Sequence, residues 1–362
     1  MKVAIRTIEN ADIGTNPWGS YARFRPIADP LWFRAHKLYW HSAFWRWLES
    51  HPLANELHRW VAVDGDQVVG HLAAVPLYYR VNRQRVVAHT PADYRALPKY
   101  GFHALSLLRT FFRTCQNCVT CDDGAEVIKL QARLGAEPVG KLQYATKLLD
   151  VSGLPVLSRP ILKPITSLLD RGSRAVDEVL MSGLEGDLKV GVLEGFDESF
   201  DELFEKIAAV MPCVLEKDAA FLNWRYGPGS PQAGITILGA WGQEGLLGYA
   251  LLLTSEEDAH YIVDLTTLPG RRDVSRALLK EAVRHFRQIR EASAIRYWAL
   301  ESPTSLRRED LWRLGFFFRE DERYTLMAKF ADSRLHRVAS DSANWAYSIG
   351  DSENNFWLST TD

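Results

Sequence analysis

The feature that most constrains this chain is an internal repeat, because one series of sequence landmarks runs through it twice. The tetrapeptide Phe44-Trp45-Arg46-Trp47 returns as Phe221-Leu222-Asn223-Trp224, and five such landmarks recur in the same order. Their offsets lie between 171 residues, from Asp93 to Asp264, and 180 residues. Small insertions in loops explain this drift. We therefore expect two copies of one folding unit in tandem.

Each copy shows the same order of expected elements. A helix with an aromatic F-x-x-W pattern leads into a β-hairpin, as in Trp60-Val61-Ala62-Val63 and Val68-Val69-Gly70-His71-Leu72 around Gly65. A strand that ends in Leu-Pro follows, then a helix with one apolar stripe, a further strand and a short helix that ends in Leu-Gly. This order predicts an α/β (α+β) fold of two tandem domains, each a mixed, mostly antiparallel sheet flanked by helices.

The repeat also sets the expected domain boundaries. The first domain covers residues 1–150 and the second covers residues 190–331, since 362 residues suit two domains of ordinary size. Residues 151–189 contain three prolines before a helix-like run, which indicates a helical linker. Residues 332–362 carry Trp345, Tyr347, Phe356 and Trp357 among polar residues, so we expect this C-terminal tail to dock on the body.

The bulk composition excludes several partners. The formal net charge of −2 gives no field that would favour nucleic acid or an anionic membrane. No run of eighteen apolar residues is present, so we expect no membrane span. The first residues, Met1-Lys2-Val3-Ala4-Ile5-Arg6, lead into acidic positions without a long apolar stretch, so we expect a cytoplasmic protein.

Three of the four cysteines, Cys115, Cys118 and Cys121, form a C-x2-C-x2-C pattern. This spacing is similar to part of an iron–sulfur ligand run, but the Cys-Pro that completes such a run is missing. Buried cysteines on or beside a strand, acting as small hydrophobic residues, explain the pattern better. We therefore expect no metal.

The chain resembles the GNAT family of acyltransferases, in particular the tandem GNAT-like proteins of bacterial polysaccharide biosynthesis, and more distantly the Fem-type aminoacyl transferases. Four segments carry the resemblance over nearly the whole chain. They are Phe221-Leu222-Asn223-Trp224-Arg225-Tyr226, Tyr261-Ile262-Val263-Asp264-Leu265 with Leu268-Pro269, Leu311-Trp312-Arg313-Leu314-Gly315-Phe316, and the stretch from Trp345 to Ile349-Gly350-Asp351.

This resemblance implies that acetyl-CoA or another acyl-CoA is the donor. In the family, the donor's pyrophosphate lies over backbone N–H groups at a helix start, where glycines allow close approach. The matching loop of the second copy, residues 270–277, has one glycine but three arginines, whereas residues 99–104 of the first copy offer one lysine and one glycine. We therefore favour the second copy, with a solvated helix start as the alternative. The predicted cofactor-binding residues are Gly270, Arg271, Arg272, Ser275 and Arg276.

Two carboxylates are the predicted catalytic groups. The family often uses a Tyr four residues before the glycine of the last Leu-Gly, but Leu311 and Gln131 occupy those positions here. Asp264 leads into the helix-start loop, and Glu301 follows the next strand. A buried carboxylate with a raised pKa would act as a base there. The structural alternative is a strand-end Asp that binds a nearby N–H group or Arg.

The predicted substrate-binding residues are Trp224, Arg225, Tyr226 and Asp93. Arg225 would hold an anionic group of the substrate with two hydrogen bonds, because the guanidinium matches carboxylate and phosphate geometry. The alternative is that Trp224 belongs to the core and Arg225 pairs at the surface.

The resemblance implies an acyl-CoA-dependent N- or O-acyltransferase that acts on a small-molecule or glycan-linked acceptor, sugar-linked or amino-acid-like, whereas the patterns alone predict two α/β domains. The second copy would carry the donor, and the first would help to form the acceptor cleft. Two alternatives stay open: a Fem-like transferase with an aminoacyl donor, and a catalytically inert tandem protein that binds a carbohydrate or a protein.

Overall fold

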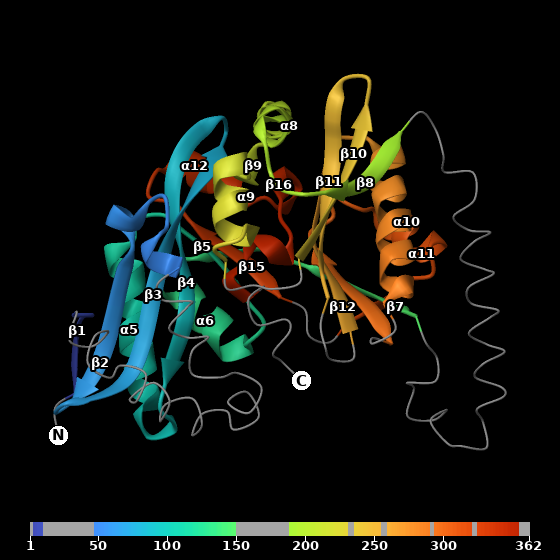
Figure 1. Cartoon of the computed structure of the whole chain (residues 1–362). Coiled ribbons are helices and arrows are strands. Elements are labelled where there is room, and N and C mark those ends of the chain that lie inside the picture. The colour runs from blue at the N-terminus through green and yellow to red at the C-terminus, as the bar shows by residue number, and fades with distance from the viewer. Residues whose placement is uncertain are drawn as a thin grey trace, which may run out of the picture.

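The computed structural model describes residues 3–9, 47–149, 188–230, 235–254, 259–289, 293–320 and 324–354. These residues form two β-sheets that stand side by side, each covered by helices (Figure 1). The predicted fold class is confirmed: the protein has two tandem α/β units. The expected linker lies almost entirely outside the described residues, as do Phe356 and Trp357 of the expected tail.

The first sheet has nine strands and is built mainly from the first half of the chain. A long hairpin, β3 (Gln67–Val81) and β4 (Gln84–Ala96), forms its centre, and the left-handed φ angles of Asn82 and Arg83 make the tight turn between them. The order is β1 (Ala4–Thr7), β2 (His58–Asp64), β3, β4, β5 (Cys118–Asp122), β15 (Thr325–Lys329) and β6 (Glu137–Lys141), with β9 (Cys213–Leu215) paired to the end of β3 and to β16 (Trp345–Ala346).

The second sheet has seven strands and repeats this plan. Its hairpin of β10 (Ile235–Gly242) and β11 (Gly245–Leu253) turns at Gly245, whose positive φ suits a glycine. The order is β14 (Phe317–Arg319), β7 (Gln143–Leu148), β13 (Ala294–Ala299), β12 (Ala259–Thr267), β11, β10 and β8 (Lys189–Leu193).

The two halves exchange one strand each. β7, from the first half, inserts between β13 and β14 of the second sheet, and β15, from the second half, inserts between β5 and β6 of the first. Each inserted strand is antiparallel to both of its neighbours. The boundaries expected from the repeat remain a prediction, but neither sheet is complete without a strand from the other half.

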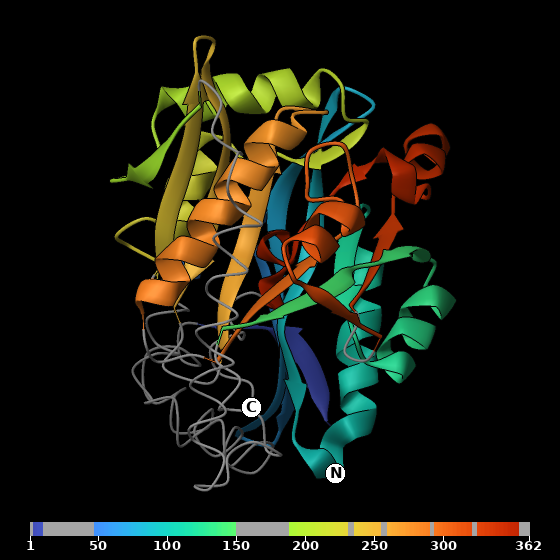
Figure 2. The same ribbon diagram turned by 90° about the vertical axis from the view of Figure 1, so that its right-hand side faces the viewer.

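The helices cover the sheets with the stripes that the sequence predicts. α5 (Gly101–Thr114) packs on the first sheet through Leu107, Leu108, Phe111 and Phe112. α10 (Arg272–Gln288) lies across the outer face of the second sheet (Figure 2) and buries residues of its apolar stripe down to Phe286. The other helices are α6 (Ala125–Arg133), α8 (Glu198–Ala208), α9 (Ala219–Tyr226), α11 (Arg308–Arg313) and α12 (Ser333–Ala339), with single turns η1 (Ala54–Glu56), η2 (Pro98–Tyr100), η4 (Ser342–Asn344) and η5 (Ile349–Asp351).

One hydrophobic core joins the two units. Its buried side chains come from both sheets and from α8 and α9, which lie between the sheets in Figure 1. The repeat-related Trp47 and Trp224 stack here with ring centroids 4.2 Å apart, and each indole N–H points at the carbonyl of the other residue, at 2.8 and 3.5 Å. Because this contact relates equivalent positions of the two copies, it marks the pseudo-twofold axis of the repeat.

All four cysteines are buried and unpaired. Cys118 and Cys121 lie on β5, and burial raises the pKa of Cys115 and Cys213 to about 12, so these thiols stay protonated and pack as small hydrophobic groups. Among the residues that the structure describes, no three His, Cys, Asp or Glu side chains lie together as a metal site would require. Within the same part of the chain, no helix is long and apolar enough to cross a bilayer.

Candidate functional site

In each sheet, two neighbouring parallel strands part at their carboxyl ends. β4 and β5 pair only at His89 and Cys118. β12 and β13 pair over four positions, from Ala259 with Ala294 to Ile262 with Tyr297, and then separate. Ligands of α/β proteins bind at such places, because the backbone groups beyond the last pair have no partner in the sheet. We call the gap between β4 and β5 the first opening and that between β12 and β13 the second opening.

The second opening is filled by the chain itself. Residues 348–354, named here the C-terminal segment, enter it where Ser348 pairs with Ala299 of β13. Next to this pair, the Leu300 N–H donates a hydrogen bond to the Tyr347 carbonyl at 2.9 Å. Gly350 lies so close to β12 that an added Cβ would come within 2.9 Å of the Val263 carbonyl oxygen. The strand edges of the second opening therefore find their partners in the C-terminal segment.

A buried cluster of charged side chains holds the C-terminal segment in the second opening. The Lys217 ammonium lies 3.0 Å from Asp264 and 3.1 Å from Asp351, and all three side chains are almost fully buried. Tyr249 and Ser348 each donate a hydroxyl to Asp264 at 3.0 Å. Burial raises the pKa of Asp351 to about 6, against the opposing pull of Lys217. Asp264, the predicted base, thus has both oxygens engaged, by Lys217 and by hydroxyl groups rather than by the N–H group or Arg of the structural alternative; its catalytic role stays a prediction.

The predicted donor-binding residues at the start of α10 are also paired with protein groups. Arg271 forms an ion pair with Asp273 at 2.7 Å, and Arg272 forms one with the fully buried Asp310 at 2.8 Å. Arg276 lies 3.8 Å from the same Asp310. Gly270 has the left-handed φ of +80° that its turn requires, and buried Ser275 donates its hydroxyl to the Arg272 carbonyl. Their binding of a phosphate remains a prediction.

Two of the three predicted substrate residues of α9 contact the C-terminal segment. Arg225 is fully buried and donates to Glu353 at 2.9 Å and to the Ser352 carbonyl at 2.7 Å. The Tyr226 hydroxyl donates to the Gly350 carbonyl at 3.0 Å. Trp224 stacks on Trp47 in the core. Arg225 and Tyr226 therefore bind the chain's own C-terminal segment in this structure, whereas Trp224 packs in the core; contact of all three with a substrate stays a prediction.

The first opening, in contrast, contains a cavity of about 140 Å³. It is bounded by the parted ends of β4 and β5, by α5 and α6, and by the last described residues of the C-terminal segment. Asn354 closes one side by donating its amide to the Cys121 carbonyl of β5 at 2.7 Å. The lining residues are Thr90, Pro91, Asp93, Tyr94, Leu108, Cys121, Asp122, Gln131, Ser352, Glu353 and Asn354.

Three carboxylates, Asp93, Asp122 and Glu353, give this cavity its chemistry. Asp93, a predicted substrate residue, is 6% exposed and lies at a β-bulge with a φ of +47°, a strained value for a side chain other than glycine. Burial raises the pKa of Asp122 to about 6 and that of Tyr94 to about 12. At neutral pH the cavity therefore presents a carboxylate of nearly neutral pKa beside a protonated phenol.

The start of α5 lies at the carboxyl end of β4. No side chain caps it, and its first turn contains no acidic residue. Lys99 is exposed immediately before it. The first turn of α10 in the second copy instead contains Asp273, which also holds Arg271. A phosphate binds where a helix start offers free N–H groups, the positive end of the helix dipole and a nearby cation. The start of α5 therefore suits a phosphate better than the start of α10 does.

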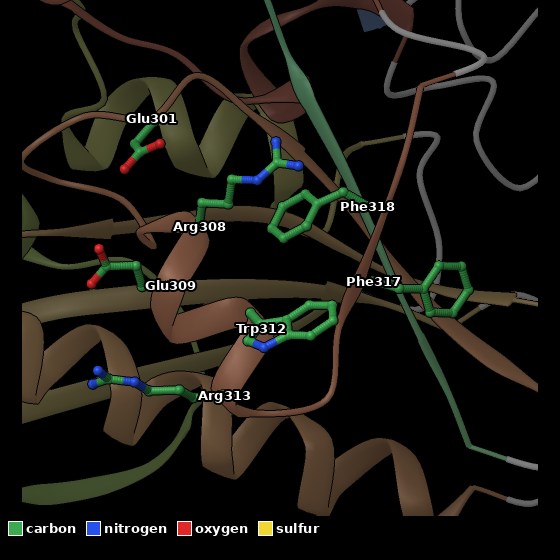
Figure 3. A pocket seen from close by; sticks show the side chains of 7 residues that line it. All are labelled: Glu301, Arg308, Glu309, Trp312, Arg313, Phe317 and Phe318. Atoms are coloured by element: carbon green, nitrogen blue, oxygen red, sulfur yellow. The ribbon is translucent and has the colours of Figure 1, made fainter.

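Glu301, the second predicted catalytic residue, lies elsewhere. It is exposed, accepts a hydrogen bond from Gln143 at 2.7 Å, and lines a surface hollow of about 770 Å³ on α11 and β14. Figure 3 shows Arg308 of this hollow beside the ring of Phe318, 4.1 Å from its centroid, with Trp312 next to them. Glu301 does not line the cavity of the first opening, and its role stays a prediction.

The sequence reasoning missed Lys217, Asp122 and Glu353. Lys217 follows the apolar stretch Met211-Pro212-Cys213-Val214-Leu215 but stands between Glu216 and Asp218, so its local sequence is typical of an exposed charged turn and does not indicate burial. Asp122 ends the strand that holds Cys118 and Cys121, where a ligand-binding carboxylate is expected. Nothing local singles out Glu353.

Comparisons with known proteins agree with this fold. A scan against protein-family models gives no match, and a search of curated proteins gives none either. Among solved structures, a GCN5-related N-acetyltransferase from Anabaena variabilis superposes with a TM-score of 0.58 at 13% identity, covering 92% of this chain and 74% of that one.

Two further structures extend the comparison. An N-myristoyltransferase from Saccharomyces cerevisiae with bound myristoyl-CoA gives a TM-score of 0.57 at 11% identity, over 91% of this chain and 79% of that one. A tandem GNAT protein from the clavulanic acid biosynthesis pathway gives 0.50 at 14% identity, over 91% and 99%. The protein therefore has a tandem GNAT fold. Identities this low establish the fold alone.

Proposed function

We propose that this protein is an acyl-CoA-dependent N- or O-acyltransferase whose donor thioester lies in the first opening. The observation that carries the proposal is the cavity where β4 and β5 part, next to the uncapped start of α5. The helix start and exposed Lys99 would hold the pyrophosphate, and the thioester would reach between the strands. The bound myristoyl-CoA of the myristoyltransferase neighbour supports this donor class.

We further propose a sugar-linked or amino-acid-like acceptor. Asp93, Asp122 and Glu353 line the cavity, and carboxylates attract an ammonium group or accept a hydrogen bond from a hydroxyl. An amine or hydroxyl of the acceptor would attack the thioester carbonyl there. The sequence-based preference for the second copy has less support, because the C-terminal segment fills the second opening and carboxylates already pair with Arg271 and Arg272.

The start of α5 offers a direct test. The melting temperature is measured with acetyl-CoA and with myristoyl-CoA, and a donor at 100 times its Kd stabilises the protein by about 2.7 kcal/mol. An added Cβ at Gly101 meets no atom within 4 Å, so Gly101→Asp places a carboxylate in the first turn without a clash. We expect Gly101→Asp to abolish the shift by repulsion and Gly101→Ala to keep it.

Three outcomes decide the matter. A shift that Gly101→Asp removes supports the first opening as the donor site. A shift that both Gly101 variants keep contradicts that placement, though not the activity. No shift with either thioester contradicts the donor class and favours the Fem-like aminoacyl donor or an inert binding protein.

A further inference from the structure

The C-terminal segment links the two openings. It begins at Ser348, paired with β13 in the second opening, and reaches Asn354, bonded to β5 in the first. The residue before Asn354 is Glu353, which comes from the second half of the chain but lines the cavity of the first opening. The second half therefore supplies a carboxylate to the site of the first.

Glu353 is held rigidly by one of its two oxygens. Its Oε1 accepts a hydrogen bond at 2.9 Å from Arg225, a guanidinium with no exposed surface. The same guanidinium fixes the backbone one residue earlier, through the Ser352 carbonyl at 2.7 Å. Since Arg225 belongs to α9 in the core between the sheets, the carboxylate has little freedom to move.

The other oxygen of Glu353 has no hydrogen-bond partner among the described residues, although the residue is only 5% exposed. Leaving a buried acceptor unpaired costs about 1–3 kcal/mol, and more when the group is charged. Such atoms are rare in folded proteins, and each one needs an explanation such as a catalytic role or a missing ligand. Asp122 also has one oxygen engaged, by the Gly124 N–H at 2.8 Å, but neither of its oxygens is a buried atom without a hydrogen-bond partner.

We propose that Glu353 is a catalytic residue that receives the proton of the acceptor through its unpaired oxygen. This inference rests on the proposed function and assigns the base of the same site. For an amine acceptor, Glu353 takes one proton from the ammonium, and the freed lone pair then forms a C–N bond at the thioester carbonyl. A hydroxyl acceptor gives its proton to Glu353 as its C–O bond forms. The C–S bond then breaks, and the CoA thiolate takes up the remaining proton of the attacking nitrogen or, for a hydroxyl, the proton held by Glu353. A proton taken from an ammonium passes from Glu353 to solvent.

The test measures release of CoA thiol by the full chain, with the acyl-CoA that gives the larger melting shift as donor. Glucosamine, mostly an ammonium at neutral pH, and hydroxylamine, already uncharged, are the acceptor probes. We expect Glu353→Gln to bind the donor with unchanged Kd and to lower kcat with glucosamine by about 100-fold or more. The loss with hydroxylamine should be at least ten times smaller, because that nucleophile has no ammonium proton to give up before it attacks.

Two further variants guard against a purely structural effect. Ser348→Ala loosens the same segment at its far end, through the bond to Asp264, and should change kcat less than about threefold. If Glu353→Gln fails to fold because it strands the Arg225 charge, Arg225→Gln with Glu353→Gln removes both charges and should show the same kinetic loss.

Several results overturn the proposal. A kcat of Glu353→Gln within threefold of the wild-type value overturns it. An equal loss of kcat with glucosamine and with hydroxylamine overturns it too. So does a wild-type protein that binds the donor but acylates neither acceptor probe. Each leaves the donor site intact as a proposal. Absence of donor binding, by contrast, ends the proposed function itself.

Discussion

The two openings are built from equivalent strands, yet one is filled and the other contains a cavity. In the second opening the C-terminal segment replaces the missing strand partners, and Lys217 forms ion pairs with the carboxylates of Asp264 and Asp351. In the first opening three carboxylates border a cavity of about 140 Å³. Duplication thus allows one copy of a site to become a scaffold, while the segment that fills it delivers Glu353 to the other.

The largest expected effect concerns the filled opening. Lys217→Met removes the cation between two buried carboxylates and should lower the free energy of unfolding by about 3–5 kcal/mol, measured by urea denaturation. Donor affinity of the remaining folded protein should not change, because the cluster lies outside the cavity of the first opening. Lys217→Met combined with Asp264→Asn and Asp351→Asn should recover much of the loss. A cost below 1 kcal/mol for Lys217→Met would show that the cluster does not hold the second opening shut.

The next effect concerns a carboxylate of the first opening. The pKa of Asp122 rises from 3.8 to about 6 on folding, because burial disfavours its charge. The folded state therefore binds more protons than the unfolded state between these values, and stability falls as the pH rises through that window. The full penalty, about 3 kcal/mol, is present above pH 6.

Asp122→Asn removes this penalty, and the amide oxygen can still accept the Gly124 N–H. We expect the variant to be more stable than the wild type by up to about 3 kcal/mol at pH 8 and equally stable near pH 3, below the unfolded pKa, measured by urea denaturation at both pH values. If the stability gain of Asp122→Asn over the wild type is the same at both pH values, the Asp122 carboxylate is well solvated in the folded protein. A stabilising change that also lowers turnover would show that the first opening keeps its charge for function.

Two glycines compare the openings directly. An added methyl at Gly350 would meet Val263 and Tyr226 within 3.0 Å, whereas one at Gly101 meets nothing within 4 Å. Gly350→Ala should therefore lower the free energy of unfolding by about 1–3 kcal/mol, and Gly101→Ala should raise it by up to about 1 kcal/mol. Thermal unfolding of both variants measures this. Equal effects would contradict the contrast between a filled and an open site.

The repeat made the architecture predictable, because hydrophobic period and turn residues are local properties. The apolar stripes around Phe112 and Phe286 indicated α5 and α10, and Gly65 and Gly245 lie at the predicted hairpin turns. The exchange of β7 and β15 was not predictable. A strand between two antiparallel neighbours has the same alternation whichever sheet receives it, so the pattern does not say which half it completes.

The site was less predictable than the fold, for a similar reason. Asp93 was singled out by its place at a strand end and does line the cavity. Arg225 was read as a substrate ligand, but the residue it binds, Glu353, lies 128 positions away in a segment without periodicity. Long-range ion pairs leave no trace in local sequence, so neither the filling of the second opening nor its partners could be foreseen.

The smallest expected effect tests which copy holds the donor. Arg271 and Asp273 form a partly exposed ion pair at the start of α10, and exposed pairs contribute at most about 1 kcal/mol because solvent screens them. Arg271→Ala should therefore change the free energy of unfolding by less than about 1 kcal/mol and leave the Kd for acyl-CoA within twofold, as measured by calorimetry. A tenfold weaker Kd would place the phosphates at α10. The arginines would then be the donor site that the sequence first indicated, and the cavity of the first opening would have to serve the acceptor.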